Sequence, residues 1–251
     1  MSIQRYKRVE SFPRDTRDYN PERCARFYTD CFNSGDFVET IVAQTGSPTI
    51  AYSSAYTSTD QTAGVSLLTI PNTVAAAGAV ARIADTGSAD SAVIKFGTNE
   101  FDIIGRVKLT VGTANAGDVY HRFGFWDTVT ARENAGDCAN GALFQCMNSS
   151  TWSVAYYNGW NGTTGVKFVK DTGVPISQWN TLSIWVASDG SMAVWQIGET
   201  VVHVQKTDML NSDSSPVRAG FIARNTGTIT TAYESRIDYM QLRMFVNRGK
   251  A

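Results

Sequence analysis

Histidine, cysteine and long apolar runs are scarce in this sequence, and each scarcity excludes a class of protein. The 251 residues include only two histidines and four cysteines, and the pairs Cys24/Cys31 and Cys138/Cys146 lack the two-residue spacing of zinc sites. No apolar run approaches the roughly 18 residues of a membrane span, and the N-terminus lacks the apolar core of a signal peptide. We therefore expect no metal, no cofactor, no membrane contact and synthesis in a cytosol. In that reducing compartment the thiols are expected to be structural, although Cys138 and Cys146 could bridge a hairpin after oxidation.

The sequence also has no excess of positive or of negative charge. The formal net charge is -1 and charged residues make up 18% of the chain, which argues against a nucleic-acid partner bound through a general electrostatic footprint. Catalytic signatures are missing as well: there is no nucleophile elbow, phosphate loop or dinucleotide fingerprint. We expect a protein that is not an enzyme.

The charges that are present crowd into the start of the chain. The first 30 residues hold 7 Lys or Arg and 5 Asp or Glu, whereas the other 221 residues hold 33 of the 45 charges. We divide the chain into an N-terminal arm with the segment that leads out of it, residues 1–42, and a globular domain, residues 43–251. The arm either lies outside the domain and binds neighbouring subunits or packs back on its own domain as a short helix or loop. In the first case the partner-binding residues would be Arg5, Tyr6, Lys7, Arg8 and Phe12.

From residue 93 onward, strand patterns recur about every 10 residues, which is typical of an antiparallel sandwich or barrel. The clearest segment is residues 179–187, WNTLSIWVA, where aliphatic side chains alternate with polar ones or tryptophan. A turn at Ser188-Asp189-Gly190 and another at Gly198-Glu199 predict a three-stranded meander. We expect the core between the sheets to include Leu182, Ile184, Val186 and Val194.

Other segments complete an all-β pattern. The Ala-rich residues 73–84 are interrupted by Gly78 and are expected to form strand and turn rather than helix. Ten to fourteen strands would curl if they formed one sheet, so the fold class we predict is an all-β, two-sheet antiparallel jelly-roll sandwich with an extended N-terminal arm. The further strands are expected at 66–70, 101–111, 119–126, 141–147, 151–157, 166–169, 217–224 and 235–246, the last with Met240, Leu242 and Met244 on one face.

The segment 178–204, QWNTLSIWVASDGSMAVWQIGETVVHV, resembles the W-x-x-L-x-I-x-V-x-x-D-G-x-x-x-V-x-x-x-G hairpin of concanavalin A-like and laminin-G-like domains. The strand 237–244, IDYMQLRM, is similar to the closing strand of that fold. This resemblance covers about residues 75–246 and implies a lectin or glucanase jelly roll. The Gly/Ala/Ser/Thr-rich first half and the charged arm also resemble the jelly-roll proteins of tailed bacteriophages, which serve in capsid decoration and tail fibres.

A glucanase of this kind would carry E-x-D-x-x-E on one strand, since two carboxyl groups must flank the scissile bond. The sequence offers Glu100 and Asp102, but Gly105 occupies the third position. Glu234 and Asp238, four residues apart, do not complete the pattern either. We therefore expect no catalytic role for these carboxylates.

An aromatic segment is the best ligand-binding candidate. Trp160 lies in an Asn-Gly-Trp-Asn-Gly loop whose glycines would turn the indole outward, where it could stack on a sugar ring or anchor a protein. Tyr157 precedes it and is the second candidate. Trp152 and Tyr156 share a strand face with Val154 and are expected in the core.

Two functions follow from these patterns. The favoured one is a virion structural protein, a capsid decoration or cement subunit or a fibre component, located in the virion. Its partners would be the major capsid protein or other virion proteins and copies of itself, most simply as a trimer. The alternative is a carbohydrate-binding, lectin-like or receptor-binding module with a glycan as partner.

Overall fold

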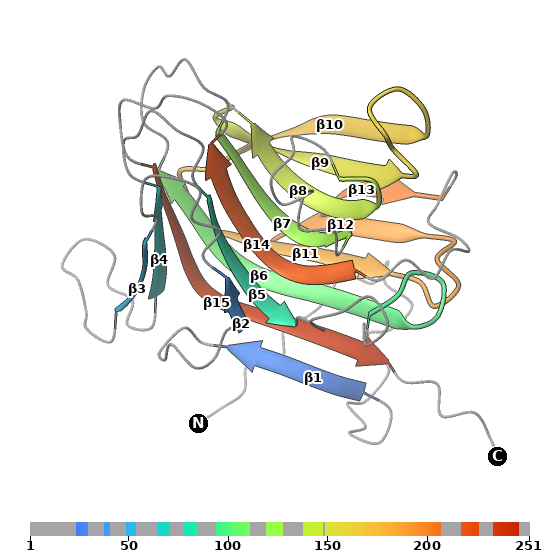
Figure 1. Ribbon diagram of the computed structural model, residues 1–251, viewed down its shortest axis with the longest axis horizontal. Coiled ribbons are helices and arrows are strands. Elements are labelled where there is room, and N and C mark those ends of the chain that lie inside the picture. The colour runs from blue at the N-terminus through green and yellow to red at the C-terminus, as the bar shows by residue number, and fades with distance from the viewer. Residues whose placement is uncertain are drawn as a thin grey trace.

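Two antiparallel β-sheets stacked face to face form the protein (Figure 1). In this computed structural model fifteen strands are defined. The structure describes residues 24–29, 38–40, 49–53, 65–70, 78–84, 94–110, 119–127, 138–147, 149–206, 217–225 and 233–245.

The first sheet has eight strands. Seven follow one another in the order β13-β12-β11-β6-β15-β4-β3, and β1 pairs with the same edge of β15 as β4, farther along the strand. Their bounds are β13 Thr200–Gln205, β12 Ala193–Ile197, β11 Asn180–Val186, β6 Glu100–Thr110, β15 Tyr233–Phe245, β4 Val65–Ile70, β3 Thr49–Ser53 and β1 Cys24–Thr29.

The second sheet has seven strands in the order β10-β9-β8-β7-β14-β5-β2. Strands that are consecutive in the chain pair directly from β7 to β10, whereas β14 inserts from the distant C-terminal part beside β7. Their bounds are β10 Val166–Pro175, β9 Thr151–Asn158, β8 Gly141–Met147, β7 Val119–Asp127, β14 Val217–Asn225, β5 Gly78–Ala84 and β2 Val38–Thr40.

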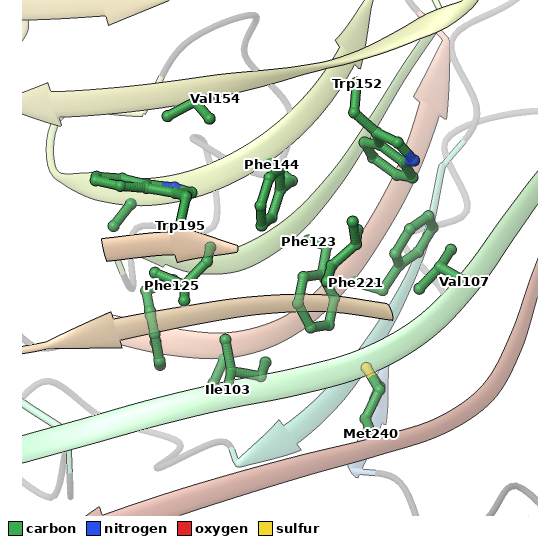
Figure 2. Close-up of a cluster of buried hydrophobic side chains, with 14 of the residues drawn as sticks. Ile103, Val107, Phe123, Phe125, Phe144, Trp152, Val154, Trp195, Phe221 and Met240 are labelled. Atoms are coloured by element: carbon green, nitrogen blue, oxygen red, sulfur yellow. The ribbon is translucent and has the colours of Figure 1, made fainter. Parts of the chain in front are cut away.

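The core lies between the sheets because every second side chain of each strand points inward. Large aromatic side chains from the seven-stranded sheet meet aliphatic ones from the eight-stranded sheet (Figure 2). The indole N–H of Trp195 in β12 donates to the carbonyl oxygen of Leu143 in β8 at 3.1 Å, which satisfies the one polar atom of that buried side chain and ties the sheets together. Trp152, Val154 and Tyr156 belong to this core, as predicted.

The predicted meander is confirmed as β11-β12-β13, and Gly190 and Gly198 take φ values of 70° and 59° in its two turns. Leu182, Ile184 and Val186 are buried between the sheets, and so are Met240, Leu242 and Met244. The prediction for Val194 is wrong in part. Val194 pairs with Trp185 and therefore shares its face, which is turned away from the core, and the two form a separate buried cluster there. Trp195 takes the inward position instead.

The sheets begin earlier in the sequence than the predicted domain boundary at residue 43. Within residues 1–42, β1 pairs with β15 and β2 pairs with β5, so the first alternative, an arm that lies outside the domain, is wrong for Cys24–Thr29 and Val38–Thr40. The physical reason is that the far half of β15 has an edge that β4 does not cover, and an antiparallel strand satisfies its backbone groups. Of the Ala-rich segment 73–84, the described part, Gly78–Ala84, is strand β5.

Cys138 and Cys146 are both free and buried. Cys146 belongs to the core between the sheets, whereas Cys138 belongs to a cluster on the opposite face of the seven-stranded sheet. The two thiols are therefore separated by the sheet, and the suggested bridge across the hairpin is not formed. Burial raises the pKa of Cys146 to about 11, which keeps this thiol protonated and unreactive.

Candidate functional site

The two described candidates from the sequence, Trp160 and Tyr157, come together on the face of the seven-stranded sheet that is turned away from the core. They contact one apolar cluster, which also contains Trp126, Cys138, Leu143, Ala155 and Ile222. The other candidates, Arg5, Tyr6, Lys7, Arg8 and Phe12, lie outside the described residues.

The loop that carries Trp160 connects β9 to β10 and is held by its own polar groups. The side-chain oxygen of Asn161 accepts hydrogen bonds from the backbone N–H groups of Thr163 and Thr164 at 3.0 and 2.8 Å. Gly162 has a φ of 103°, a conformation that side chains disfavour, so the Asn-Gly pair determines the loop's shape. The loop is consequently set before any ligand arrives.

Trp160 is held in place on the side that faces the sheet and is partly exposed to solvent on the other. Its backbone N–H donates to the carbonyl oxygen of Ala139 at 2.9 Å, and its ring packs on the cluster while the residue stays half-buried. The ammonium of Lys167 lies 5.6 Å from the ring centroid, within cation–π range. Tyr157 is buried, and its hydroxyl donates to the side-chain oxygen of Gln145 at 3.2 Å. Tyr157 thus supports the ring of Trp160 and connects it to Gln145.

Beyond Gln145 the same face carries three buried arginines. Arg122 lies opposite Gln145 in the register of β7 and β8, and its guanidinium lies 5.1 Å from the ring centroid of Tyr120. Arg224 lies opposite Tyr120 in the register of β14 and β7. Burial is the main cause that lowers the pKa of Arg224, and the charge of Arg122 adds to it in a smaller measure. Arg218, opposite Trp126, is the third arginine of this face.

These arginines and Tyr120 were not predicted as site residues. The signal was present as alternation: Tyr120, Arg122 and Trp126 occupy every second position with Gly124 between them, and their neighbours Phe123 and Phe125 enter the core. The sequence could reveal that they share a face but could not show that β14 would bring Arg218 and Arg224 beside them.

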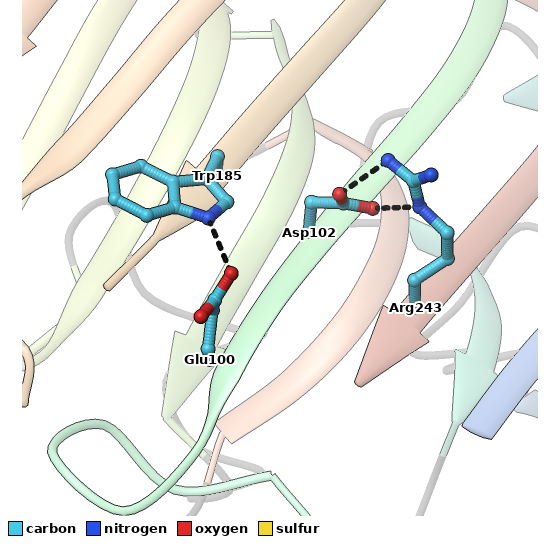
Figure 3. Close-up of polar contacts among 4 residues, drawn as sticks. All are labelled: Glu100, Asp102, Trp185 and Arg243. Atoms are coloured by element: carbon cyan, nitrogen blue, oxygen red, sulfur yellow. Dashed lines mark hydrogen bonds and ion pairs between the residues drawn. The ribbon is translucent and has the colours of Figure 1, made fainter. Parts of the chain in front are cut away.

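The carboxylate pair considered for glycosidase chemistry lies on the other sheet, on the face of β6 away from the core (Figure 3). Both oxygens of Asp102 accept hydrogen bonds from Arg243, at 2.8 and 2.5 Å, and Asp102 is fully buried. Glu100 accepts a hydrogen bond from the indole of Trp185 at 3.5 Å. At Gly105 an added Cβ would lie 2.6 Å from the ring of Phe123, so core packing explains why this position carries no side chain.

One histidine is buried between the sheets. His121 is buried in β7, and its Nδ1 lies 2.9 Å from the hydroxyl of Ser235 in β15, so this hydrogen bond joins the two sheets. Burial lowers the pKa of His121 to about 3, so its imidazole is neutral at neutral pH. In the described part of the chain, no group of three or more His, Cys, Asp or Glu side chains is placed to hold a metal ion. No helix among these residues is long and apolar enough to cross a membrane.

No family model matches the chain, and no curated protein matches it. Several solved structures share its fold at low sequence identity. The protein of unknown function SO2946 from Shewanella oneidensis MR-1 has a TM-score of 0.56 at 13% identity, covering 91% of this chain and 90% of its own. The Emp47p carbohydrate recognition domain has a TM-score of 0.52 at 13% identity, covering 91% of this chain and 100% of its own. The Crh5 transglycosylase, solved in complex with NAG, has a TM-score of 0.52 at 11% identity, covering 88% of this chain and 83% of its own.

Proposed function

We propose that this chain, whose fold is the concanavalin A-like jelly roll, is a lectin-like module that binds a glycan against Trp160 and releases it unchanged. The observation that carries the proposal is the state of Trp160, an indole partly open to solvent on a loop that its own hydrogen bonds hold in shape.

Sugar rings present apolar faces with hydroxyl groups around their rims, so a protein binds them with an aromatic ring and nearby polar groups. Trp160 supplies the ring, the ammonium of Lys167 lies 5.6 Å from its centroid, and the exposed Thr163 belongs to the same loop. A loop that is already ordered loses little conformational entropy when it binds. The geometry therefore favours recognition of a saccharide over a protein partner of large area.

The proposal includes the absence of hydrolysis. A glycosidase needs two carboxyl groups on either side of one glycosidic bond. The pair Glu100 and Asp102 lies on the sheet opposite to Trp160, and Asp102 is held by Arg243. The fold by itself does not decide this point, because it is shared by a carbohydrate recognition domain and by a transglycosylase.

A glycan array followed by titration calorimetry tests the proposal. We expect saturable binding that Trp160→Ala reduces at least about tenfold, the loss of roughly 1.4 kcal/mol of binding free energy. Trp179→Ala is the matched control, because Trp179 is also half-buried but lies under the guanidinium of Arg106 at 5.0 Å, far from the β9–β10 loop. Binding that survives Trp160→Ala, or no binding to any glycan, would contradict the proposal. Release of reducing ends that disappears on Glu100→Gln would instead identify an enzyme.

A second candidate is a structural protein of a virion, which binds an assembled shell through the charged N-terminal arm. The observation that favours it is the crowding of 12 charged residues into the first 30. Deletion of residues 2–23, which stops before β1, should then leave the melting temperature unchanged and abolish co-sedimentation with assembled particles. Unchanged co-sedimentation would refute this candidate without affecting the glycan proposal.

A further inference from the structure

The seven-stranded sheet ends at β10, and the outer edge of this strand is open. Among the strands that the structure describes, β9 is the only one that pairs with β10 (Figure 1). Six of the ten residues of β10 are exposed, and four of these are Lys167, Val169, Lys170 and Asp171. Backbone N–H and C=O groups point outward along such an edge, so it can pair with a strand of another chain.

An apolar side chain is exposed on this edge strand. Val169 is 44% exposed, and in the described part of the chain the other exposed large apolar side chains are Met147 and Val204. Val204 belongs to β13, which ends the other sheet on the same side of the sandwich, since His203 of β13 stacks on Phe168 of β10 at 4.6 Å. Two of these three apolar side chains therefore lie on the strands where a neighbouring molecule can extend the sheets.

The far end of β10 limits the length that can pair. Between Asp171 and Pro175 the register with β9 shifts, and the side chain of Asp171 accepts a hydrogen bond from the backbone N–H of Gly173 at 3.0 Å. Gly173 has a φ of 70°, and Pro175 has no backbone N–H to donate. The regular part of the edge is therefore residues 166–171, which is the length of an ordinary strand.

From this edge we infer that two copies of the chain form a dimer by antiparallel pairing of their β10 strands around a twofold axis beside Val169. Val166 and Phe168 pack against the core, so Lys167, Val169 and Asp171 lie on the other face of the strand. Because paired strands keep their core-facing side chains on one side, each residue must lie opposite one from the same face.

The charges of β10 select one register. With Val169 opposite its counterpart, Lys167 of each copy lies opposite Asp171 of the other, and Lys170 lies opposite Phe168. Side chains that are directly opposite have Cβ atoms about 5 Å apart, so the two valines cover each other and both ion pairs can form. A shift of two residues in one direction places Lys170 opposite itself, and the same shift in the other direction places Lys167 opposite Val169. The first register is the only one of the three that pairs opposite charges.

The dimer has a consequence for the proposed function and does not depend on it. The twofold axis is perpendicular to the joined sheet, so the Trp160 loops of both copies lie on the same side. A dimer with two glycan sites on one side binds a multivalent glycan more tightly than one copy does. Loss of the dimer leaves a glycan site in each copy, and the absence of any glycan binding leaves the dimer intact, so the two proposals fail separately.

Sedimentation of residues 1–251 over a range of concentrations tests the dimer. We expect a mass that approaches twice the 27.4 kDa of one chain. Val169→Lys should weaken self-association at least about tenfold, because two like charges then lie opposite each other. Met147→Lys, which also replaces an exposed apolar side chain, is the matched control and should leave self-association unchanged. A monomeric wild type would overturn the inference, and so would a dimer that is lost in Val204→Lys and kept in Val169→Lys.

Charge reversal tests the register. Lys167→Asp places two carboxylates opposite each other, and Asp171→Lys places two ammonium groups opposite each other, so each variant alone should associate at least about tenfold more weakly than the wild type. In an equimolar mixture, a dimer of one copy of each has opposite charges at both positions, so association should recover. Circular dichroism of each variant confirms the fold. A mixture that associates no better than either variant alone would refute this register and the inference with it.

Discussion

The outward faces of the two sheets carry their charged side chains among different neighbours. On the eight-stranded sheet, bases and acids are interleaved and paired: Arg243 with Asp102, Arg106 with Asp238 at 2.7 Å, and Arg236 with Glu234 at 3.2 Å. On the seven-stranded sheet, three buried arginines share a face with tyrosine, tryptophan and glutamine.

The difference concerns stability. Removing one partner of an ion pair within a face costs stability, above all where the pair is buried. We therefore assign stability to the ion pairs on the face of β6 and β15, and the proposed function places binding on the opposite sheet, at Trp160.

The largest effect is expected from the core that both faces share. Ile184 of β11 lies beneath β7, where its Cδ1 is 2.7 Å from the position that a Cβ of Gly124 would occupy. Ile184→Asp should abolish soluble folding, because an unpaired carboxylate in this core costs more than about 4 kcal/mol. Expression and circular dichroism test this, with Ser183→Asp on the opposite face of the same strand as the control. A soluble, native-like Ile184→Asp protein would show that the strand phase is wrong.

The next effect separates the two faces. Asp102→Asn should lower the free energy of unfolding by about 3 to 5 kcal/mol, because it leaves the guanidinium of Arg243 beside a neutral, fully buried partner. Asp238→Asn removes a carboxylate from a more exposed pair, 36% and 21% exposed, so at most about 1 kcal/mol is expected. Lys167→Gln, on the binding face, should change stability by less than about 0.5 kcal/mol. Urea unfolding of the three variants measures this order, and equal losses would remove the contrast between the faces.

A smaller effect concerns the hydrogen bond between the sheets and depends on pH. The folded-state pKa of His121 is lowered to about 3 from an ordinary value of 6.5. Below pH 6.5 the unfolded chain therefore binds a proton at His121 that the folded protein does not bind. The contribution of the neutral, buried His121 to the free energy of unfolding is complete above pH 6.5 and is lost as the pH falls towards 3. The loss at pH 4 is about 3 kcal/mol.

Unfolding at pH 7 and pH 4 tests this expectation. The wild type should lose about 3 kcal/mol more than His121→Gln over this interval, while His203→Gln should behave as the wild type does. His203 is the appropriate control because it stacks on Phe168 at 4.6 Å, at the edge of the sandwich where the end strands β13 and β10 lie. Equal acid sensitivity in the wild type and His121→Gln would refute the role of this histidine.

Local patterns predicted much of the fold, because alternation and turn residues act over a few neighbouring positions. The meander from Asn180 to Gln205 shows this: Leu182, Ile184 and Val186 define the inward face, and Gly190 defines the turn. The face of Val194 was predicted wrongly because alternation allows either set of side chains to point inward. The pairing of β12 with β11, which places Val194 opposite Trp185, decides between the two. The short strands β1 and β2 were not predicted, since their partners β15 and β5 lie elsewhere in the chain.

The candidate site was predicted only in its local part. Trp160 could be identified from the glycines around it, because loop chemistry is a property of adjacent residues. The buried arginines of the same face could not, because Arg122 and Arg224 are about a hundred positions apart in sequence and meet only when β14 pairs with β7. Long-range register, which no short segment encodes, assembles this part of the site.

The position of β15 has a consequence for the order of events during folding. Tyr233–Phe245 is the only described strand that pairs with three others, β6 on one edge and β4 and β1 on the other. A ribosome has therefore made β1, β4 and β6 long before the segment that joins them exists. Contacts between residues this far apart form slowly, because a long loop must close first. Until residue 245 has been synthesised, the edges of β4 and β6 that pair with β15 have no partner and can pair with other chains. We therefore expect that chaperones, rather than the fold itself, prevent aggregation during synthesis.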